Sequence, residues 1–126
     1  MLIIAIDPGL TTGLVVADEK GPRLILDIDH TDIPRVLDHV FEEYGRGAVV
    51  YVEEPPAITS NASSIVKAVE REIARAFNYC RRETVAPATW KPHPRARDLS
   101  AAMAHSPHTK DAMGIASYAL WKEGQA

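Results

Sequence analysis

The segment LIIAIDPG, residues 2–9, joins an apolar strand to an acidic residue at a turn. Residues 2–6 are apolar on both alternating faces, which is typical of a central strand covered on both sides of a sheet. Asp7 is then the last residue of this strand. Pro8 fixes the first corner of a tight turn, and we expect Gly9 to adopt the positive φ of such a turn.

The Asp7 carboxylate needs an explanation, because a charge at the end of a buried strand is costly unless it is neutralised, protonated or bound to a cation. One interpretation is an ordinary aspartate that hydrogen-bonds its own Pro-Gly turn. The other is an acidic residue of a functional site, which requires further acidic or metal-binding residues nearby.

Strands and helices follow one another along the rest of the chain. Apolar runs and alternation predict strands at residues 2–7, 13–17, 23–29, 48–52 and 83–86. Helical spacing and capping residues predict helices at residues 33–44, 61–82 and 106–121, with a short helix around 99–104. A turn at Lys20-Gly21-Pro22 makes the first three strands an antiparallel meander. The helix that follows them favours a parallel return into the same sheet.

The composition is that of one globular domain. The 126 residues include 46% hydrophobic and 25% charged residues, close to the averages for soluble proteins. Cys80 is the only cysteine, so neither an intrachain disulfide nor a thiol-rich metal site can form, and we expect a buried, inert thiol. The first apolar run is too short to span a membrane, so we expect a cytosolic protein without membrane contact.

Positive charge is concentrated in one stretch of the chain. The net charge of −3 argues mildly against nucleic-acid binding. Between residues 81 and 97, however, only Glu83 is acidic, and the basic residues are Arg81, Arg82, Lys91, Arg95 and Arg97. This stretch is either a solvated surface or a contact for a phosphate backbone.

Three motifs resemble those of the RuvC-type Holliday junction resolvases. Residues 3–16, IIAIDPGLTTGLVV, are similar to the first hairpin of that family. Residues 49–56, VVYVEEPP, resemble its second acidic motif, and residues 108–116, HTKDAMGIA, resemble its last helix. The resemblance frames nearly the whole chain and implies a single α/β domain over residues 1–126. The implied fold is RNase H-like, with a five-stranded mixed sheet in the order β-β-β-α-β-α-β-α and helices on both faces.

In that fold the fourth strand lies beside the first, so two carboxylates would meet at neighbouring strand ends. Like charges so placed call for a cation. The second carboxylate is Glu53 or Glu54, depending on the pleat and on any bulge before Pro55, and we favour Glu53.

His108 and Asp111 are three residues apart on the last predicted helix, so their side chains project from one face. In a non-functional alternative, the negative charge of Asp111 only stabilises the positive N-terminal end of the helix dipole, and His108 is an exposed loop residue. Carboxylates with one imidazole suit Mg²⁺ or Mn²⁺. The resemblance implies two such ions per site, with Asp7, Glu53, His108 and Asp111 as ligands and catalytic residues.

The resemblance also implies an activity and partners. It implies symmetric paired hydrolysis of four-way DNA junctions by a homodimer, leaving 5′-phosphate and 3′-hydroxyl ends. The wide apolar stripe of the helix at about 61–82 is the candidate dimer surface. Lys91 matches a basic residue that members of this family place near the scissile phosphate. The family has a second lysine farther along the chain, and Arg95 or Arg97 is the candidate replacement for it here. Trp90 beside Lys91 is expected to be a packing residue rather than a base-stacking one.

Three other functions remain to be compared. Sugar kinases, chaperone ATPases and actin-like proteins use a similar hairpin for nucleotide phosphates, but they need a second lobe, so we expect no nucleotide cofactor. A nuclease acting on other branched DNA or on RNA-DNA hybrids would have the same residues. A non-catalytic junction-binding relative would bind without cleaving.

Overall fold

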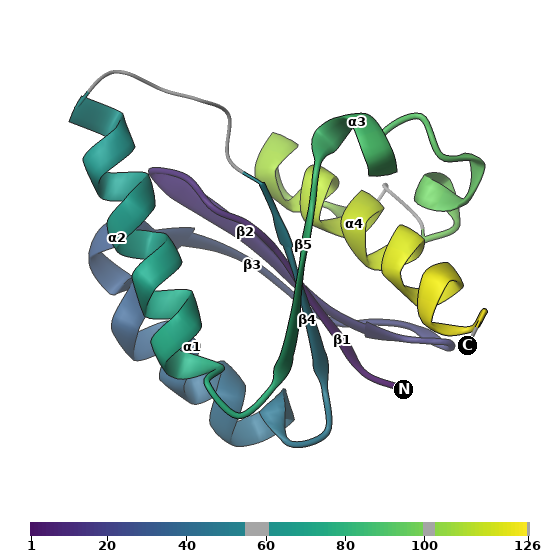
Figure 1. The fold of residues 1–126 in the computed structure, drawn as a ribbon, viewed down its shortest axis with the longest axis horizontal. Coiled ribbons are helices and arrows are strands. Elements are labelled where there is room, and N and C mark those ends of the chain that lie inside the picture. Colours follow the sequence, from purple (N-terminus) through teal and green to yellow (C-terminus); the bar gives the residue numbers. More distant parts are fainter. Residues whose placement is uncertain (55–60, 100–102, 126) are drawn as a thin grey trace.

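A five-stranded mixed sheet of order β3-β2-β1-β4-β5 lies at the centre of the protein (Figure 1). The structure is a computed structural model that describes residues 1–54, 61–99 and 103–125. The strands are β1 (Ile3–Asp7), β2 (Thr11–Asp18), β3 (Gly21–Asp29), β4 (Val49–Glu53) and β5 (Arg81–Val85). The helices are α1 (Ile33–Val40), α2 (Asn61–Ala76), α3 (Pro87–Trp90) and α4 (Pro107–Glu123), and the short 3-10 helices are η1 (His30–Asp32) and η3 (Pro94–Arg97).

The strand pairing confirms the predicted meander and the parallel return. β1 pairs antiparallel with β2, which brings Asp7 opposite Gly13. β1 pairs parallel with β4, with Ile6 opposite Val52. Parallel neighbours end at the same edge of a sheet, so the end of β1 and the end of β4 lie together.

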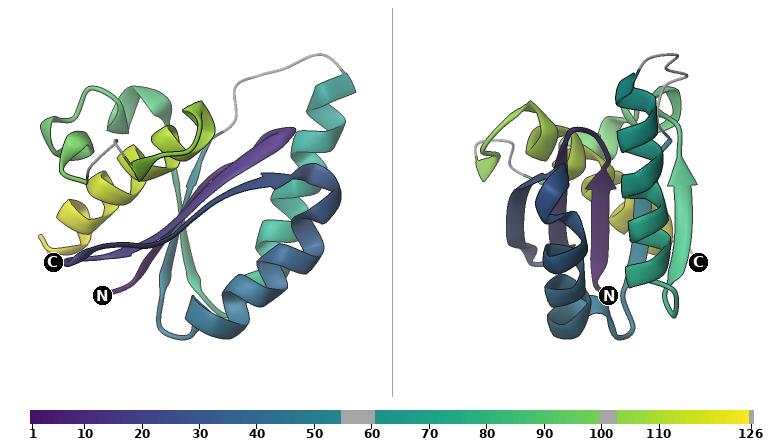
Figure 2. Two further views of the ribbon diagram at one scale, coloured as in Figure 1. Left: turned by 180° about the vertical axis from the view of Figure 1, so that it is seen from behind. Right: turned by 90° about the vertical axis from the view of Figure 1, so that its left-hand side faces the viewer.

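Helices cover both faces of the sheet, as predicted. Figure 2 shows α1 and α2 on one face and α4 on the other. On β1, Ile4 and Ile6 pack into the core formed with α1 and α2, whereas Ile3 and Ala5 pack into the core formed with α4. All four side chains are fully buried. This two-sided burial is the reason that the β1 segment is apolar on both faces.

The second long helix is shorter than predicted. α2 ends at Ala76, and β5 begins at Arg81 instead of residue 83. Arg81 and Arg82 pair with Val49 and Val50 of β4, so hydrogen bonding to the sheet edge prevails over the helical spacing of apolar residues. Cys80 therefore lies outside the helix, where its half-buried thiol donates to the carbonyl oxygen of Gly45.

The apolar stripe of α2 is mostly used inside the protein. Val69, Ile73, Ala76 and Phe77 belong to the core beneath α1 and α2. These four positions therefore serve the core, and the stripe as a dimer surface stays a prediction. Ile65, by contrast, is only partly buried.

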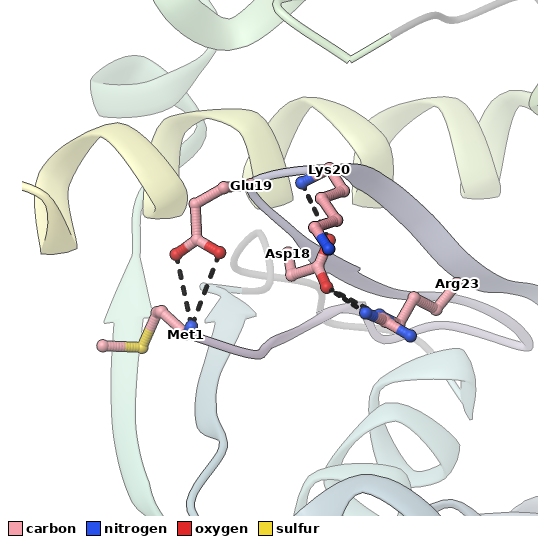
Figure 3. A network of polar contacts seen from close by, with 5 residues as sticks. All are labelled: Met1, Asp18, Glu19, Lys20 and Arg23. Carbon is pink, nitrogen blue, oxygen red and sulfur yellow. Dashed lines mark hydrogen bonds and ion pairs between the residues drawn. The ribbon is translucent and has the colours of Figure 1, made fainter.

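The turn between β2 and β3 lies earlier than predicted. Gly21 and Pro22 already pair with β2, and the turn itself is Glu19-Lys20. Asp18 holds this turn, since its carboxylate accepts hydrogen bonds from the Lys20 backbone at 2.9 Å and from Arg23 Nε at 2.7 Å (Figure 3). The Met1 amino group lies beside Glu19 at 3.2 Å.

The turn after Asp7 also differs from expectation in one respect. Gly21 and Gly47 have positive φ angles among the described residues, and Gly9 does not. A Cβ atom at Gly9 would nevertheless lie 3.0 Å from the Thr11 carbonyl oxygen, so the turn leaves little room for a side chain.

The remaining boundaries differ by a few residues. α1 ends at Val40 and continues as a π-helical turn, Phe41–Gly45, where one regular helix was predicted. The predicted irregular region contains α3 and η3, and the short helix expected around 99–104 falls largely outside the described residues. The last helix is confirmed, with Ser106 as its N-cap and Pro107 in its first turn. No helix in the described ranges is long and apolar enough to cross a membrane.

Candidate metal and nucleic-acid site

Asp7 and Glu53 end two neighbouring parallel strands and point to the same face of the sheet. Side chains alternate along a strand, so Asp7 shares the face of Ile3 and Ala5, which pack against α4. Glu53 likewise shares the face of Val49 and Tyr51, which belong to the same core. The end of the sheet therefore presents two carboxylates toward α4.

The same alternation decides between the two adjacent glutamates. Glu53 is 7% exposed, whereas Glu54 is exposed and points to the other face. The Glu54 backbone N–H donates to the carbonyl oxygen of Val85 at 2.8 Å, so the extended pairing continues through this residue. In the structure, therefore, the Glu53 side chain lies on the face of the candidate site and the Glu54 side chain does not.

α4 brings a third carboxylate to this place. Its first residues lie directly on β2, because a Cβ atom at Gly13 would stand 2.2 Å from the His108 carbonyl oxygen. The N-cap Ser106 also donates a 2.6 Å hydrogen bond to Asp27 of β3. Gly13 and Asp27 are paired with each other on the neighbouring strands β2 and β3. With the helix start fixed at two points, Asp111 lies near the strand ends.

Electrostatic coupling shows that the three carboxylates are close. Burial, together with the negative charges of Glu53 and Asp111, raises the pKa of Asp7 to about 7 against the lowering effect of Lys91. Burial also raises the pKa of Glu53. At neutral pH the protein thus holds a half-protonated carboxyl group beside two other acids, which is an arrangement that a cation would stabilise.

A tryptophan holds Glu53 in place. The indole Nε1 of Trp90 donates a 2.9 Å hydrogen bond to Glu53 Oε2, and both side chains are buried. The indole fits because Gly114 of α4 has no side chain, since a Cβ atom there would lie 2.4 Å from the ring. Trp90 was predicted to be a packing residue; it packs, and it is also a hydrogen-bond donor to the candidate site.

The chemistry of the donors fits a divalent cation, although the side chains do not form a closed cage. Asp7, Glu53 and Asp111 offer the oxygen ligands that Mg²⁺ and Mn²⁺ prefer. Within residues 1–54, 61–99 and 103–125, no three Asp, Glu, His or Cys side chains are close enough to enclose one ion. Asp7 also receives no side-chain hydrogen bond from the described residues, so its carboxylate is available to a ligand.

His108 is less closely associated with the site than its three proposed companions. Its backbone packs on Gly13 of β2, but its side chain is exposed. Among the described residues, no hydrogen bond or ion pair joins its ring to a carboxylate of the site. The structure brings together Asp7, Glu53 and Asp111, and leaves the His108 side chain at their edge.

The predicted basic residues divide into two groups. Lys91 and Arg97 line a pocket of about 540 Å³ together with Asp111. Arg81 and Arg82 lie at the start of β5, at the opposite end of the sheet from Glu53. There Arg81 pairs with Glu83 and Glu123, and Arg82 donates to the Phe77 carbonyl oxygen. Arg95 pairs with Asp98 at 2.6 Å.

Lys110 was missed in the sequence. It lines the same pocket as Lys91 and Arg97. Its place immediately before Asp111 in HTKDAMGIA was the only local signal, and it is a weak one, because adjacent residues of a helix point in different directions.

Structural comparison relates the chain to solved RuvC structures. It matches T. thermophilus RuvC in complex with a Holliday junction substrate with a TM-score of 0.76 and 19% sequence identity, over 98% of this chain and 96% of the other. The fold is that of RuvC. A second Thermus thermophilus RuvC structure gives a TM-score of 0.71 at 19% identity, over 99% and 97% of the two chains.

The comparison confirms the RNase H-like α/β fold expected from the three motifs. No family model matches the sequence, and no curated protein matches it. The RuvC likeness therefore extends over the backbone of nearly the whole chain while most side chains differ.

Proposed function

We propose that this protein is a divalent-metal-dependent endonuclease that resolves four-way DNA junctions. The observation that carries the proposal is that Asp7 and Glu53 end neighbouring parallel strands of a RuvC-like fold, on the face that α4 covers, with Asp111 near enough to influence both electrostatically. One of the similar structures is a RuvC complex with a Holliday junction substrate, which supports branched DNA as the substrate class.

The proposed chemistry is hydrolysis of a phosphodiester with the help of two Mg²⁺ or Mn²⁺ ions. Asp7 would hold both ions, and Glu53, Asp111 and His108 would complete the ligand set. Bound ions of this kind activate water and stabilise the charge that develops on the phosphate. Trp90 keeps the Glu53 carboxylate oriented toward Asp7. The products would be 5′-phosphate and 3′-hydroxyl ends.

Lys91 would contact the DNA phosphates next to the cleaved bond. Its ammonium nitrogen lies 5.6 Å from the centre of the Trp90 ring, whose indole N–H donates to Glu53. Its positive charge also lowers the pKa values of Asp7 and Glu53. Arg95 and Arg97 both belong to η3, and Arg97 lines the same pocket as Lys91. Arg81 and Arg82 are weaker candidates for DNA contact, because they lie at the other end of the sheet.

A homodimer remains part of the proposal, because resolving a junction requires two symmetric cuts. Its proposed contact is the helix at about 61–82, now α2 and the residues that follow. A groove of about 380 Å³ runs between α1 and α2 and is lined by Ile33, Ile65 and Val69 among others. Sedimentation equilibrium of the wild type and of Ile65→Glu tests this: a dimer that the variant weakens supports the α2 contact.

Two other functions fit the same residues. Cleavage of flaps, other branched DNA or RNA-DNA hybrids would use the same acids and ions. A junction-binding protein without activity would retain the basic residues but would not need the coupled carboxylates, so the raised pKa of Asp7 favours catalysis.

The experiment compares four substrates with one pair of variants. A synthetic four-way junction, a flap, a plain duplex and an RNA-DNA hybrid are incubated with Mg²⁺ or Mn²⁺ and either the wild type or Asp7→Asn. Asp38→Asn is the matched control, because Asp38 is exposed on α1 and pairs with Arg75. We expect symmetric cuts in the junction by the wild type and by Asp38→Asn, and none by Asp7→Asn.

Each outcome has a distinct meaning. Preferential cutting of the hybrid or the flap would replace the junction as substrate and keep the metal site. Binding of the junction without cutting in either metal would reject the enzyme. Normal cutting by Asp7→Asn would reject the proposed active centre.

A further inference from the structure

The pocket beside Asp111 combines positive charge with an apolar interior. Its lining residues come from α4 and from the segment that contains α3 and η3, and Figure 1 shows that segment beside α4. Its cationic side chains are those of Lys91, Arg97 and Lys110. Its apolar lining comes from Trp90, Ala96, Leu99, Met113 and Gly114.

No ion pair among the described residues involves Lys91, Arg97 or Lys110. Lys91, Arg97 and Lys110 are exposed. The ion pairs among described residues all involve other cations, including Arg95, whose partner Asp98 is a near neighbour of Arg97. The Lys91 ammonium lies over the Trp90 ring, 5.6 Å from its centre. Three cations around one hollow that form no ion pair within the described part of the chain attract an anion.

The apolar lining distinguishes this pocket from a simple anion site. Trp90 and Met113 are buried at its floor, and Leu99 is partly buried at its wall. An inorganic anion gains nothing from such surfaces, whereas a molecule with a flat apolar part and a phosphate uses both. The volume of about 540 Å³ lies in the range of pockets that enclose one small organic ligand.

The position of the pocket indicates where the ligand comes from. Asp111 belongs both to the acidic cluster and to the pocket lining. Gly114 follows three residues later on the same face of α4, so the pocket begins at the cluster and extends about one helical turn, roughly 5 Å, along the helix. A DNA strand whose phosphate lies at the carboxylates would place its neighbouring nucleotide here.

We propose that this pocket binds one unstacked nucleotide of the DNA strand that enters the acidic site, with its phosphate on Lys91, Arg97 and Lys110 and its base against the apolar floor. The inference rests on the proposed function for the identity of the strand as DNA. A base inside a continuous duplex must be unstacked before it can enter, at a cost of a few kcal/mol, and this cost is smallest where pairing is already disturbed. The pocket would therefore favour branched DNA over a regular duplex.

The test measures binding of two short strands that carry the same charge. Fluorescence anisotropy with Ca²⁺ in place of Mg²⁺ compares a labelled thymidine octanucleotide with an octamer of abasic sites. For the wild type we expect the abasic strand to bind about tenfold more weakly, the usual contribution of one well-held base. Free dTMP serves as a separate probe and is expected to bind more weakly than the octanucleotide.

Variants separate the base from the phosphate. Leu99→Ala should reduce the difference between the two strands to less than about threefold, since it removes part of the wall. Arg97→Gln and Lys110→Gln should weaken the binding of both strands by the same factor. Each should also lower the slope of log affinity against log salt concentration by about one. Lys20→Gln is the matched control, because Lys20 lies in the β2–β3 turn and not in the pocket (Figure 3).

Four results would overturn the proposal. Equal binding of the thymidine and abasic strands by the wild type would show that no base enters the pocket. An unchanged difference in a folded Leu99→Ala variant would place the base elsewhere. Arg97→Gln and Lys110→Gln behaving like Lys20→Gln would exclude the phosphate contact. Tighter binding of dTMP than of the octanucleotide would indicate a free nucleotide as the ligand.

Failure of this inference is distinguishable from failure of the proposed function. If the wild type cuts the junction but binds both octamers equally, the endonuclease stands and the nucleotide pocket does not. If the thymidine octamer is preferred but no junction is cut, the pocket stands and the proposed resolvase activity does not.

Discussion

The indole Nε1–H of Trp90 and the Oε2 atom of Glu53 form a 2.9 Å hydrogen bond between two buried side chains that are 37 residues apart. The bond links α3 to the end of β4 and fixes one oxygen of Glu53. The other Glu53 oxygen is left for a ligand, so Trp90 acts as a positioning residue for the proposed metal site.

Replacement of Trp90 by phenylalanine tests this role. Trp90→Phe keeps an aromatic ring on Gly114 but removes the N–H, which leaves a carboxylate oxygen without its donor at a cost of about 2 kcal/mol. We expect about 10- to 100-fold slower junction cleavage and a raised Mn²⁺ concentration for half-maximal rate. Trp121→Phe is the control, since Trp121 packs on His93 away from Glu53. A variant that loses stability but keeps its metal dependence would show that Trp90 only packs.

The two adjacent glutamates should differ in their effect on activity. Glu53→Gln removes a negative charge from the face shared with Asp7, and we expect cleavage to fall at least about 100-fold, as is usual for loss of a metal ligand. Glu54→Gln removes the same charge from an exposed position and should change cleavage less than about threefold. Rates on the same junction at saturating Mn²⁺ check both. A larger loss of cleavage in Glu54→Gln than in Glu53→Gln would mean that the two glutamates exchange faces of the sheet when DNA binds.

The pKa of Asp7 predicts how the metal-free protein responds to pH. Its value is about 7 when folded and 3.8 in an unfolded chain, so the folded state holds the proton more tightly. The resulting stability is complete below about pH 4 and is lost as the pH rises toward 7. After allowance for solvent screening we expect a contribution of about 2 kcal/mol.

Urea unfolding in EDTA between pH 5 and pH 8 measures this contribution. The wild type should lose more stability across this range than Asp7→Asn, and the variant should be the more stable protein at pH 8. Added Mn²⁺ should stabilise the wild type at pH 8 and have little effect on Asp7→Asn. Parallel stability curves for the two proteins would contradict the raised pKa.

The sequence predicts the layers of this fold well because they depend on periodicity. The apolar faces of β1, β4 and α4 require burial on particular sides, which predicts a sheet covered by helices. The position of β4 beside β1, where Asp7 and Glu53 meet, was implied by the resemblance to the RuvC-type fold. Helix ends are less predictable. The apolar spacing continues through Cys80, yet pairing of Arg81 with β4 ends α2 earlier, and such pairing is a long-range effect.

The site could be predicted in part for the same reason. Local patterns place Asp7 and Glu53 at strand ends and Asp111 on a helix, whereas the expectation that these residues share one site came from the resemblance to the RuvC-type motifs. Trp90 and Lys110 depend on how α3 and η3 fold onto α4, and no local pattern in residues 87–105 specifies that packing. Arg81 and Arg97 look alike in the sequence, and only the sheet register puts them at different ends.

Gly13 should be essential for the placement of α4. A Cβ atom at this position would lie 2.2 Å from the His108 carbonyl oxygen, so Gly13→Ala must push the helix start away from β2. Overpacking of this kind costs about 1–3 kcal/mol. We expect a lower urea midpoint and reduced cleavage, because Asp111 moves with the helix. Gly124→Ala is the control, since its nearest contacts are 3.3 Å or more. Full activity of Gly13→Ala would mean that α4 tolerates the shift.

Arg81 should contribute to the structure rather than to DNA binding. Its guanidinium pairs with Glu83 and Glu123, and Glu123 also accepts a 2.6 Å hydrogen bond from the buried Tyr51 hydroxyl. Arg81→Gln removes this link between β5 and the end of α4, so the urea midpoint should fall slightly. Junction affinity and its salt dependence should be unchanged, whereas Arg97→Gln should lower the salt dependence by about one ion. Equal losses of affinity in the two variants would instead extend the DNA surface to both ends of the sheet.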